Sequence, residues 1–267
     1  MYLKKPIASF TLILFIGLAI SSCFKPRTDA NDTDTSLSQN YSYVEQNNNE
    51  INNIVIEVIE KDTITSLKTD DVSDLLSSCV HFTKTSSQDS ITVIIDFGTS
   101  NCLCNDQKYR RGKIVIHALA NKTWAKAETV NFYVNDNLIE GTRIIARSSI
   151  LEVSVKGSTK ITLGDSATIS EDFNRSITLT EGYMTPSVSD DVFTITGSTT
   201  GVSKKGAYTT EIVSPLKRKR TCANIVSGVL KIKIENKLDR LIDFGSGDCD
   251  NLVTLSIGKY SKIIALQ

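Results

Sequence analysis

Apolar and polar residues alternate with a period of two over much of this chain. In the clearest run, at 230–235, every second residue is leucine or isoleucine, and the residues between them are lysine or glutamate. Because successive side chains of a strand point to opposite faces, this pattern indicates antiparallel strands with one buried and one solvated face. Similar runs occur at 93–97, 114–116, 151–156, 161–163, 177–179 and 193–195.

Turn-forming residues separate these runs. Glycine, asparagine, aspartate and serine cluster at 135–137, 156–158, 164–166 and 197–201. The intervals of roughly 8–12 residues are typical of all-β folds. The sequence therefore predicts a mainly β protein, arranged as an antiparallel meander or sandwich.

One segment before the strands has a different period. Apolar residues at 51, 54, 55, 58 and 59 recur at spacings of three and four, which predicts one short amphipathic helix near 48–61. The run Ile54-Val55-Ile56 is β-branched, however, and would also suit a strand.

A short motif occurs twice. Ile-Asp-Phe-Gly at 95–98 is followed by a cysteine at 102, and the same four residues at 242–245 are followed by a cysteine at 249. A cysteine also precedes each copy, at 79 and 222, and a Gly-Lys step follows each, at 112–113 and 258–259. This duplication predicts two related β-units, one at 76–185 that includes connecting strands and one at 186–267. Each unit is expected to contain a strand that ends in a glycine turn, which presents a cysteine to the first strand of that unit.

The N-terminus has the three parts of an export signal. Lys4 and Lys5 precede an apolar stretch at 7–20, and Ile20-Ser21-Ser22-Cys23 resembles the lipobox of bacterial lipoproteins. An uncleaved transmembrane helix is the alternative, but the apolar stretch is shorter than the about 20 residues that span a bilayer. We therefore expect a signal peptide at 1–22 and a lipid on Cys23, with fatty acids such as palmitate holding the chain to a membrane.

The residues after the lipidated cysteine predict a spacer. Residues 23–47 are rich in Thr, Asp, Ser, Asn and Gln, a composition typical of a polar tether, and a helical lead-in is expected at 48–75. In enteric bacteria, an aspartate directly after the lipidated cysteine favours retention of a lipoprotein in the inner membrane. This chain has Phe24 at that position, so by analogy we expect it in the outer membrane. The side of the membrane that the protein faces stays open.

The expected export also indicates the oxidation state of the remaining cysteines. An oxidising compartment preserves disulfides, so we expect the pairs Cys79–Cys102 and Cys222–Cys249, which close loops of similar length in the two units. Cys104 is an alternative partner for Cys79. A thiolate metal site suits neither the compartment nor the neighbouring residues.

Charge excludes one class of partner. The chain has 30 Lys and Arg and 30 Asp and Glu, a balance that does not favour nucleic-acid binding. The one basic cluster, at 217–220, is expected to be a solvated strand end or loop.

No motif predicts catalysis or a cofactor. His81 and His117 are expected at the surface, without a catalytic partner. Asp96 and Asp243 occupy equivalent places in the repeat; they are expected to accept hydrogen bonds from their own glycine turns rather than to serve as an acid–base pair for glycan cleavage.

Calcium is a weak alternative. Asp248, Asp250 and Asn251 offer oxygen ligands on one turn, but they are few for a cation that usually takes six or more. We therefore predict no metal centre.

These motifs together resemble a family of uncharacterised outer-membrane lipoproteins from Bacteroidetes-type bacteria. The resemblance rests on the duplicated Ile-Asp-Phe-Gly…Cys element, on 110–114, on 133–137 with 140–142, and on 195–197, and it covers about 79–267. Where that family tends to have Asp-Gly-Arg, this chain reads Asp106-Gln107-Lys108. The family carries no established activity, so the resemblance implies an envelope location and no functional residues.

Three functions follow as expectations. The first is a non-enzymatic, lipid-anchored module that binds an envelope protein or glycan, or is structural; Trp124, Tyr109 and Tyr133 could contribute to a binding surface. The second is an envelope hydrolase acting on glycan, which a cleft with paired, buried carboxylates would favour. The third is a carrier of an apolar ligand, which an open apolar concave face would favour.

Overall fold

The computed structural model describes residues 32–60 and 78–266. The predicted signal peptide at 1–22, Cys23 with its expected lipid, the start of the predicted tether and the part of the predicted lead-in after residue 60 lie outside these residues. The described part contains helix α1 (Ser36–Glu60) and 14 strands. The strands are β1 (His81–Ser86), β2 (Ser90–Asp96), β3 (Cys102–Leu103), β4 (Tyr109–Leu119), β5 (Trp124–Val134), β6 (Asn137–Arg147), β7 (Glu152–Thr162), β8 (Thr168–Glu181), β9 (Val192–Ser203), β10 (Gly206–Lys219), β11 (Ile225–Ile234), β12 (Arg240–Ser246), β13 (Leu252–Ile257) and β14 (Tyr260–Ala265).

All strands belong to one antiparallel sheet. Apart from the short β3, which pairs only with β4, each strand lies beside its neighbours in the chain, from the edge strand β1 to the edge strand β14. The prediction of a mainly β fold is confirmed, and the meander is the arrangement found. In addition, no described helix is long and apolar enough to cross a membrane.

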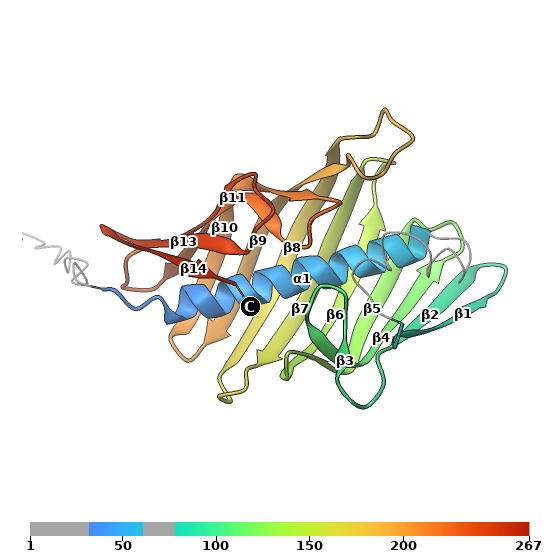
Figure 1. Cartoon of the computed structure of the whole chain (residues 1–267), viewed down its shortest axis with the longest axis horizontal. Coiled ribbons are helices and arrows are strands. Elements are labelled where there is room, and N and C mark those ends of the chain that lie inside the picture. The colour runs from blue at the N-terminus through green and yellow to red at the C-terminus, as the bar shows by residue number, and fades with distance from the viewer. Residues whose placement is uncertain (1–31, 61–77, 267) are drawn as a thin grey trace, which may run out of the picture.

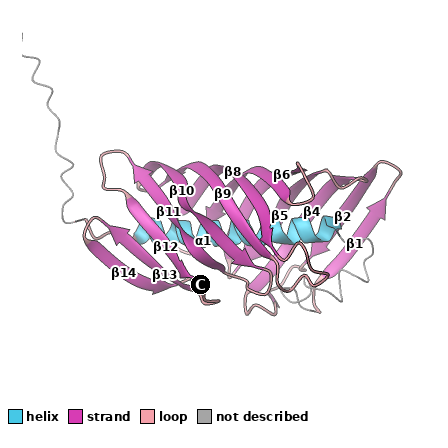
Figure 2. Ribbon diagram, turned by 90° about the horizontal axis from the view of Figure 1, so that it is seen from above, coloured by secondary structure: helices cyan, strands magenta, loops and turns pink. Residues whose placement is uncertain are grey.

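Helix α1 lies along the concave face of the sheet, which we call the trough, and the strands cross behind it (Figure 1). The view from above shows the sheet curving around the helix (Figure 2). Nineteen of the 25 residues of α1 are buried, so the helix is enclosed on most sides. Its apolar side chains, among them Val44, Ile54 and Val58, join Ile114, Leu230 and other inward-facing strand residues in one core.

The predicted boundary between tether and helix was wrong, because helix α1 begins earlier, at Ser36. Residues 36–47, expected in the polar tether, form the first half of α1, and Asn47 and Asn48 are buried. A polar segment can be buried when its hydrogen-bonding groups find partners. Here the strands supply them, as when Thr159 on β7 donates to Oδ1 of Asn48 at 2.8 Å.

Two inward-facing glycines leave room for aromatic rings in the trough. A Cβ on Gly157 would lie 2.7 Å from Cζ of Phe173, and a Cβ on Gly201 would lie 2.4 Å from Cζ of Tyr208. Such distances are too short for van der Waals contact, so any side chain at either position would displace a buried ring. These glycines in the middle of strands therefore serve the packing against α1.

The two copies of the repeat lie near the two ends of the sheet. In each copy a hairpin, β1–β2 or β11–β12, is followed by a cysteine and by the strand that pairs with the second strand of the hairpin. Cys79–Cys102 and Cys222–Cys249 are disulfides with Cα–Cα distances of 6.1 and 5.8 Å. The structure thus brings together both predicted pairs, and the buried Cys104 belongs to neither.

The Gly-Lys steps that follow the two motifs are not equivalent. Lys113 lies within β4 and pairs with Asp96, whereas residues 258–259 form the turn between β13 and β14. The predicted division at 185/186 falls in the loop between β8 and β9, and these strands pair from Ile169–Ser203 to Glu181–Val192. The two units are therefore continuous through one sheet.

Candidate binding cleft between the two ends of the sheet

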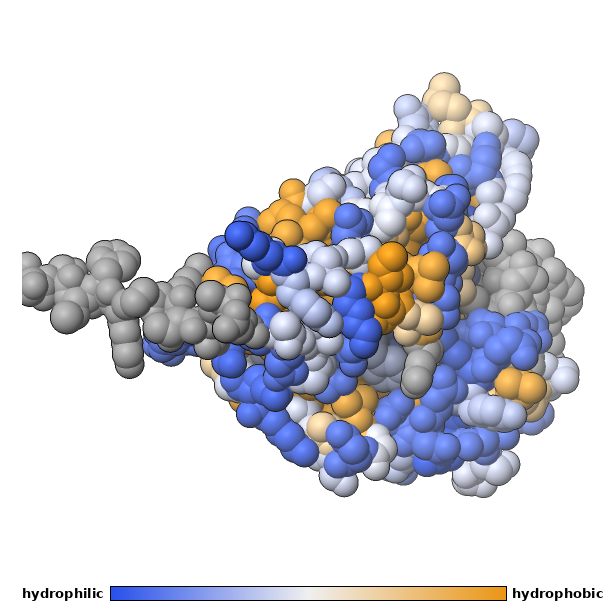
Figure 3. Space-filling view, turned by 60° about the vertical axis from the view of Figure 1, so that its left-hand side comes forward, coloured by the Kyte–Doolittle hydropathy of each residue, from blue (hydrophilic) through white to orange (hydrophobic). Residues whose placement is uncertain are grey.

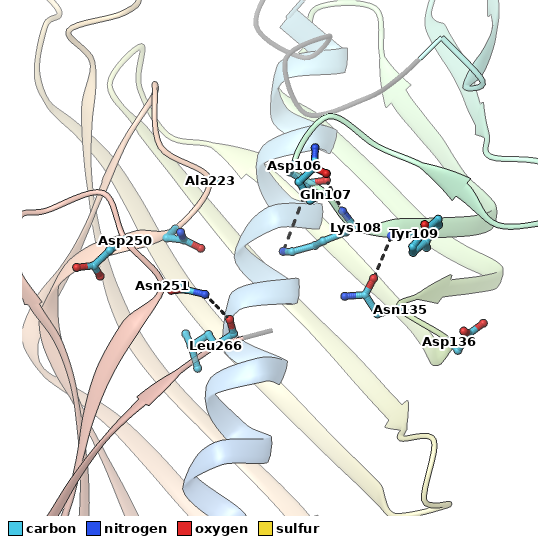
Figure 4. A pocket seen from close by; sticks show the side chains of 11 residues that line it. Asp106, Gln107, Lys108, Tyr109, Asn135, Asp136, Ala223, Asp250, Asn251 and Leu266 are labelled. Carbon is cyan, nitrogen blue, oxygen red and sulfur yellow. Dashed lines mark hydrogen bonds and ion pairs between the residues drawn. The ribbon is translucent and has the colours of Figure 1, made fainter.

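A large hollow lies where the two ends of the sheet approach each other across α1. This cleft has a volume of about 810 Å³. One wall consists of the β3–β4 loop and the β5–β6 turn, and the other consists of segments just before β11 and β13 with the chain end after β14 (Figure 4). The lining residues are Asp106, Gln107, Lys108, Tyr109, Asn135, Asp136, Ala223, Asn224, Asp250, Asn251 and Leu266.

One face of α1 holds both walls. Glu50 forms an ion pair with Lys108 at 2.6 Å and another with Arg110, which fixes the β3–β4 loop. Gln46, one turn earlier, donates from Nε2 to Oδ1 of Asn224 on the opposite wall at 2.5 Å. Residues four apart in a helix lie on the same face, so a single turn of α1 sets the spacing of the walls.

Charges in the first wall are largely satisfied by each other. Arg110 is fully buried and bonds to both carboxylate oxygens of Asp106, at 2.8 and 2.7 Å. Burial raises the pKa of Asp106 and lowers the pKa of Lys108, because both groups lose water that would solvate their charge. The positive charge of Lys108 is directed at α1 rather than left for a ligand.

The β5–β6 turn completes the same wall. Asn135 and Asp136 have positive φ values of 47° and 63°, which suit the two central residues of a tight hairpin turn. Oδ1 of Asn135 accepts a hydrogen bond from the backbone N–H of Tyr109 at 3.0 Å. Arg111 bonds to Asp136, lowering the pKa of that carboxyl, and lies 3.8 Å from the centre of the Tyr133 ring. The turn is thereby tied to β4.

The second wall is held by a disulfide and by the chain end. The Cys222–Cys249 bond joins the two segments that carry Asn224 and Asp250. Nδ2 of Asn251 donates to the carbonyl oxygen of Leu266 at 2.8 Å, and the backbone N–H of Leu266 donates back to the carbonyl of Asn251. This wall is therefore built by covalent and backbone contacts.

The lining of the cleft is mostly polar. Apart from Ala223 and Leu266, every lining residue carries a polar or charged side-chain group. Gln46, which holds Asn224, is 5% exposed and does not itself line the cleft. The arrangement can bind a polar molecule.

Comparison with protein-family models, with curated proteins and with solved structures found no match to this chain.

The residues proposed as metal ligands do not converge on one point. Asp248, Asp250 and Asn251 are exposed; Oδ1 of Asp250 accepts from the backbone N–H of Leu252, and Asn251 bonds to the chain end. Within 32–60 and 78–266, no group of three or more His, Cys, Asp or Glu side chains is placed to hold a metal ion.

The repeated aspartates take the structural role predicted for them. Oδ1 of Asp96 accepts from the backbone N–H of Gly98, and Oδ1 of Asp243 accepts from that of Gly245, both at 2.9 Å. Both glycines have positive φ values, 81° and 91°. The two aspartates belong to β2 and β12, separated in the sheet by β4 to β11.

The other predicted residues are scattered. His81 and His117 are exposed, as expected. Among the three aromatic candidates, Tyr109 lines the cleft and is 46% exposed, Tyr133 stacks with Arg111, and Trp124 lies elsewhere on β5.

The basic cluster at 217–220 differs from the prediction of a solvated segment. Lys217 and Lys219 are exposed, but Arg218 is buried and lies 4.4 Å from the centre of the Phe193 ring. Arg220 pairs with Glu57 of α1 at 2.9 Å. The alternation of the strand thus directs half of the cluster inward.

Sequence reasoning missed the buried polar network of the trough. Arg175 on β8 bonds to Glu45 of α1 at 2.7 Å and to Thr199 at 2.8 Å, and Tyr41 donates to the same carboxylate at 2.9 Å. Strand register was the available signal, because Arg143 and Arg175 occupy inward positions between apolar residues. An arginine at such a position needs a buried partner.

A second carboxylate lies beside this pair. Glu171 accepts from Nδ2 of Asn48 at 2.7 Å and from the hydroxyl of Tyr208 at 3.1 Å. Burial, together with the nearby charge of Glu45, raises the pKa of Glu171 to about 8. The interior therefore holds a carboxyl that stays protonated near neutral pH.

Proposed function

We propose that this protein is a lipid-anchored cell-envelope protein, without enzymatic activity, that binds an envelope component in the cleft between the two ends of its sheet. The cleft is the observation that carries the binding role. Its volume of about 810 Å³ falls within the about 300–1,000 Å³ of typical ligand sites, and its walls are held by α1 and a disulfide. Such a preformed site loses little entropy on binding.

The structure offers less support for the two alternative functions. A carrier needs an open apolar face, but the trough is filled by α1, and the face seen in Figure 3 shows hydrophobic residues in separate groups among hydrophilic ones. A hydrolase acting on glycan needs two carboxylates that face a cleft. Glu45 and Glu171 are instead enclosed in the interior, and Asp96 and Asp243 belong to separate ends of the sheet.

The anchor is tested by changing its attachment point. Cys23→Ala removes the thiol that would carry the lipid, so the variant is expected to incorporate no radiolabelled palmitate and to leave the membrane fraction. The wild-type chain is the control. Normal labelling of the variant would contradict the anchor.

The cleft is tested by filling it. Ala223 is exposed and lines the cleft, so Ala223→Trp adds a bulky ring without removing a contact. We expect this variant to retain at least tenfold less of a labelled, delipidated envelope extract from the native host than the wild type does. Ala207→Trp places the same ring on exposed β10 outside the cleft and serves as the matched control. Equal retention by all three proteins would refute the proposal.

A further inference from the structure

The charge of the cleft restricts its ligand. Its one lining cation, Lys108, is 2.6 Å from Glu50 and directed at α1, and Asp136 is paired with Arg111, whereas Asp250 is exposed. Phosphate and acidic sugars would therefore meet like charge without a free cation to bind them. Ala223 and Leu266 are the only aliphatic residues of the lining, which does not suit a lipid.

The amide groups of the cleft have both donors and acceptors to offer. Asn135, Asn224 and Asn251 each use one end of the side chain to hold a wall. The opposite ends, two Nδ2 donors and the Oδ1 acceptor of Asn251, make no hydrogen bond within the described part of the chain. A hydroxyl group both donates and accepts, so a ligand with several hydroxyls matches this mixture.

An aromatic ring adds an apolar platform. Tyr109, at the start of β4, is 46% exposed and lines the same wall as Asn135 (Figure 4). A tyrosine offers an apolar face together with a polar hydroxyl. The apolar C–H face of a pyranose ring can lie on such a face while its hydroxyls reach the amides.

We infer that the cleft between the β3–β4 loop and the segment before β13 binds a neutral oligosaccharide. This inference rests on the proposed binding function and adds the chemical class of the ligand. Tyr109 supports a sugar ring, and the amides of Asn135, Asn224 and Asn251 bind its hydroxyls.

The test is an array of neutral oligosaccharides, with α- and β-linked glucose, mannose, galactose and N-acetylglucosamine chains, probed with the full-length protein. We expect binding to at least one neutral chain, reduced at least tenfold by Tyr109→Ala and by Ala223→Trp. Tyr183→Ala removes a tyrosine of similar exposure, 52%, in the β8–β9 loop and is expected to bind as the wild type does. Tyr109→Ala removes a contact with the sugar, whereas Ala223→Trp fills the space that the sugar would occupy. A folding defect in one variant therefore does not decide the result.

The possible failures are distinguishable. If no neutral chain binds, or if phosphorylated or uronic-acid chains on the same array bind more strongly, the sugar class is wrong. The proposed binding function still stands in that case if Ala223→Trp lowers retention of the envelope extract. If Tyr183→Ala weakens sugar binding as much as Tyr109→Ala does, the cleft is not the sugar site.

Discussion

Arg175→Met is expected to lower the free energy of unfolding by about 3–5 kcal/mol, because it leaves a buried carboxylate without its counter-charge. Glu45 lies on α1 with a side chain 2% exposed, and Arg175 bonds to both of its oxygens, at 3.3 and 2.7 Å. The protonated Glu171 nearby cannot replace the lost cation. Urea denaturation of residues 24–267, followed by circular dichroism, measures the loss.

Two further variants separate the ion pair from general damage. Glu45→Gln combined with Arg175→Met removes both charges and keeps one oxygen acceptor for Tyr41 or Asn49, so it is expected to recover at least about 2 kcal/mol. Lys160→Met breaks the exposed pair with Glu140, 3.4 Å long, and is expected to cost less than about 1 kcal/mol. The buried pair is unimportant if Arg175→Met costs no more than Lys160→Met.

Glu171→Gln is expected to make the protein more stable at pH 8 by up to about 4 kcal/mol and to leave it nearly unchanged below pH 4.5. The pKa of Glu171 is raised from 4.5 in the unfolded chain to about 8 in the folded protein, so the folded state binds an additional proton between these values. Stability contributed by this group is therefore complete below pH 4.5 and falls as pH rises toward 8. A glutamine at this position stays neutral at every pH, so the variant does not lose this stability as pH rises.

The measurement is the unfolding free energy at several pH values from 4 to 9 for the wild type and the variant. The groups facing Glu171 are Glu45, Arg175, Tyr208 and Asn48, and an amide can keep the contacts to Asn48 and Tyr208. Asp172→Asn changes the next residue, which is exposed, and serves as the control. Parallel pH profiles for wild type and Glu171→Gln would show that Glu171 titrates normally in the folded protein.

Strands and disulfides were predictable because their signals are local. Alternation of apolar residues located six of the 14 strands, and the duplicated cysteines identified the pairs at 79–102 and 222–249. The first half of α1 was not predictable in this way, because Asn47 and Asn48 look like solvent-exposed residues. Asn48 is buried by partners 111 and 123 residues away, Thr159 and Glu171, and no local pattern encodes such contacts.

The cleft could be anticipated only in part. The repeat indicated two related units, but not that they would face each other. Residues such as Gln107, Asn135 and Asn251 come from separate turns, where polar residues are ordinary. Only the tertiary arrangement, with Gln46 and Glu50 holding opposite walls, distinguishes them from other turn residues.

Helix α1 precedes all the described strands in the sequence, and this order determines when the fold can be completed. The helix is synthesised before every described strand, yet Gln46 bonds to Asn224, 178 residues later, and Asp32, just before the helix, accepts from Arg240, 208 residues later. Its asparagines and β-branched residues are weak helix formers, and an isolated helix of this kind is not stable in water. Helix α1 therefore reaches its final contacts only after β12, near the end of the described chain, has been made.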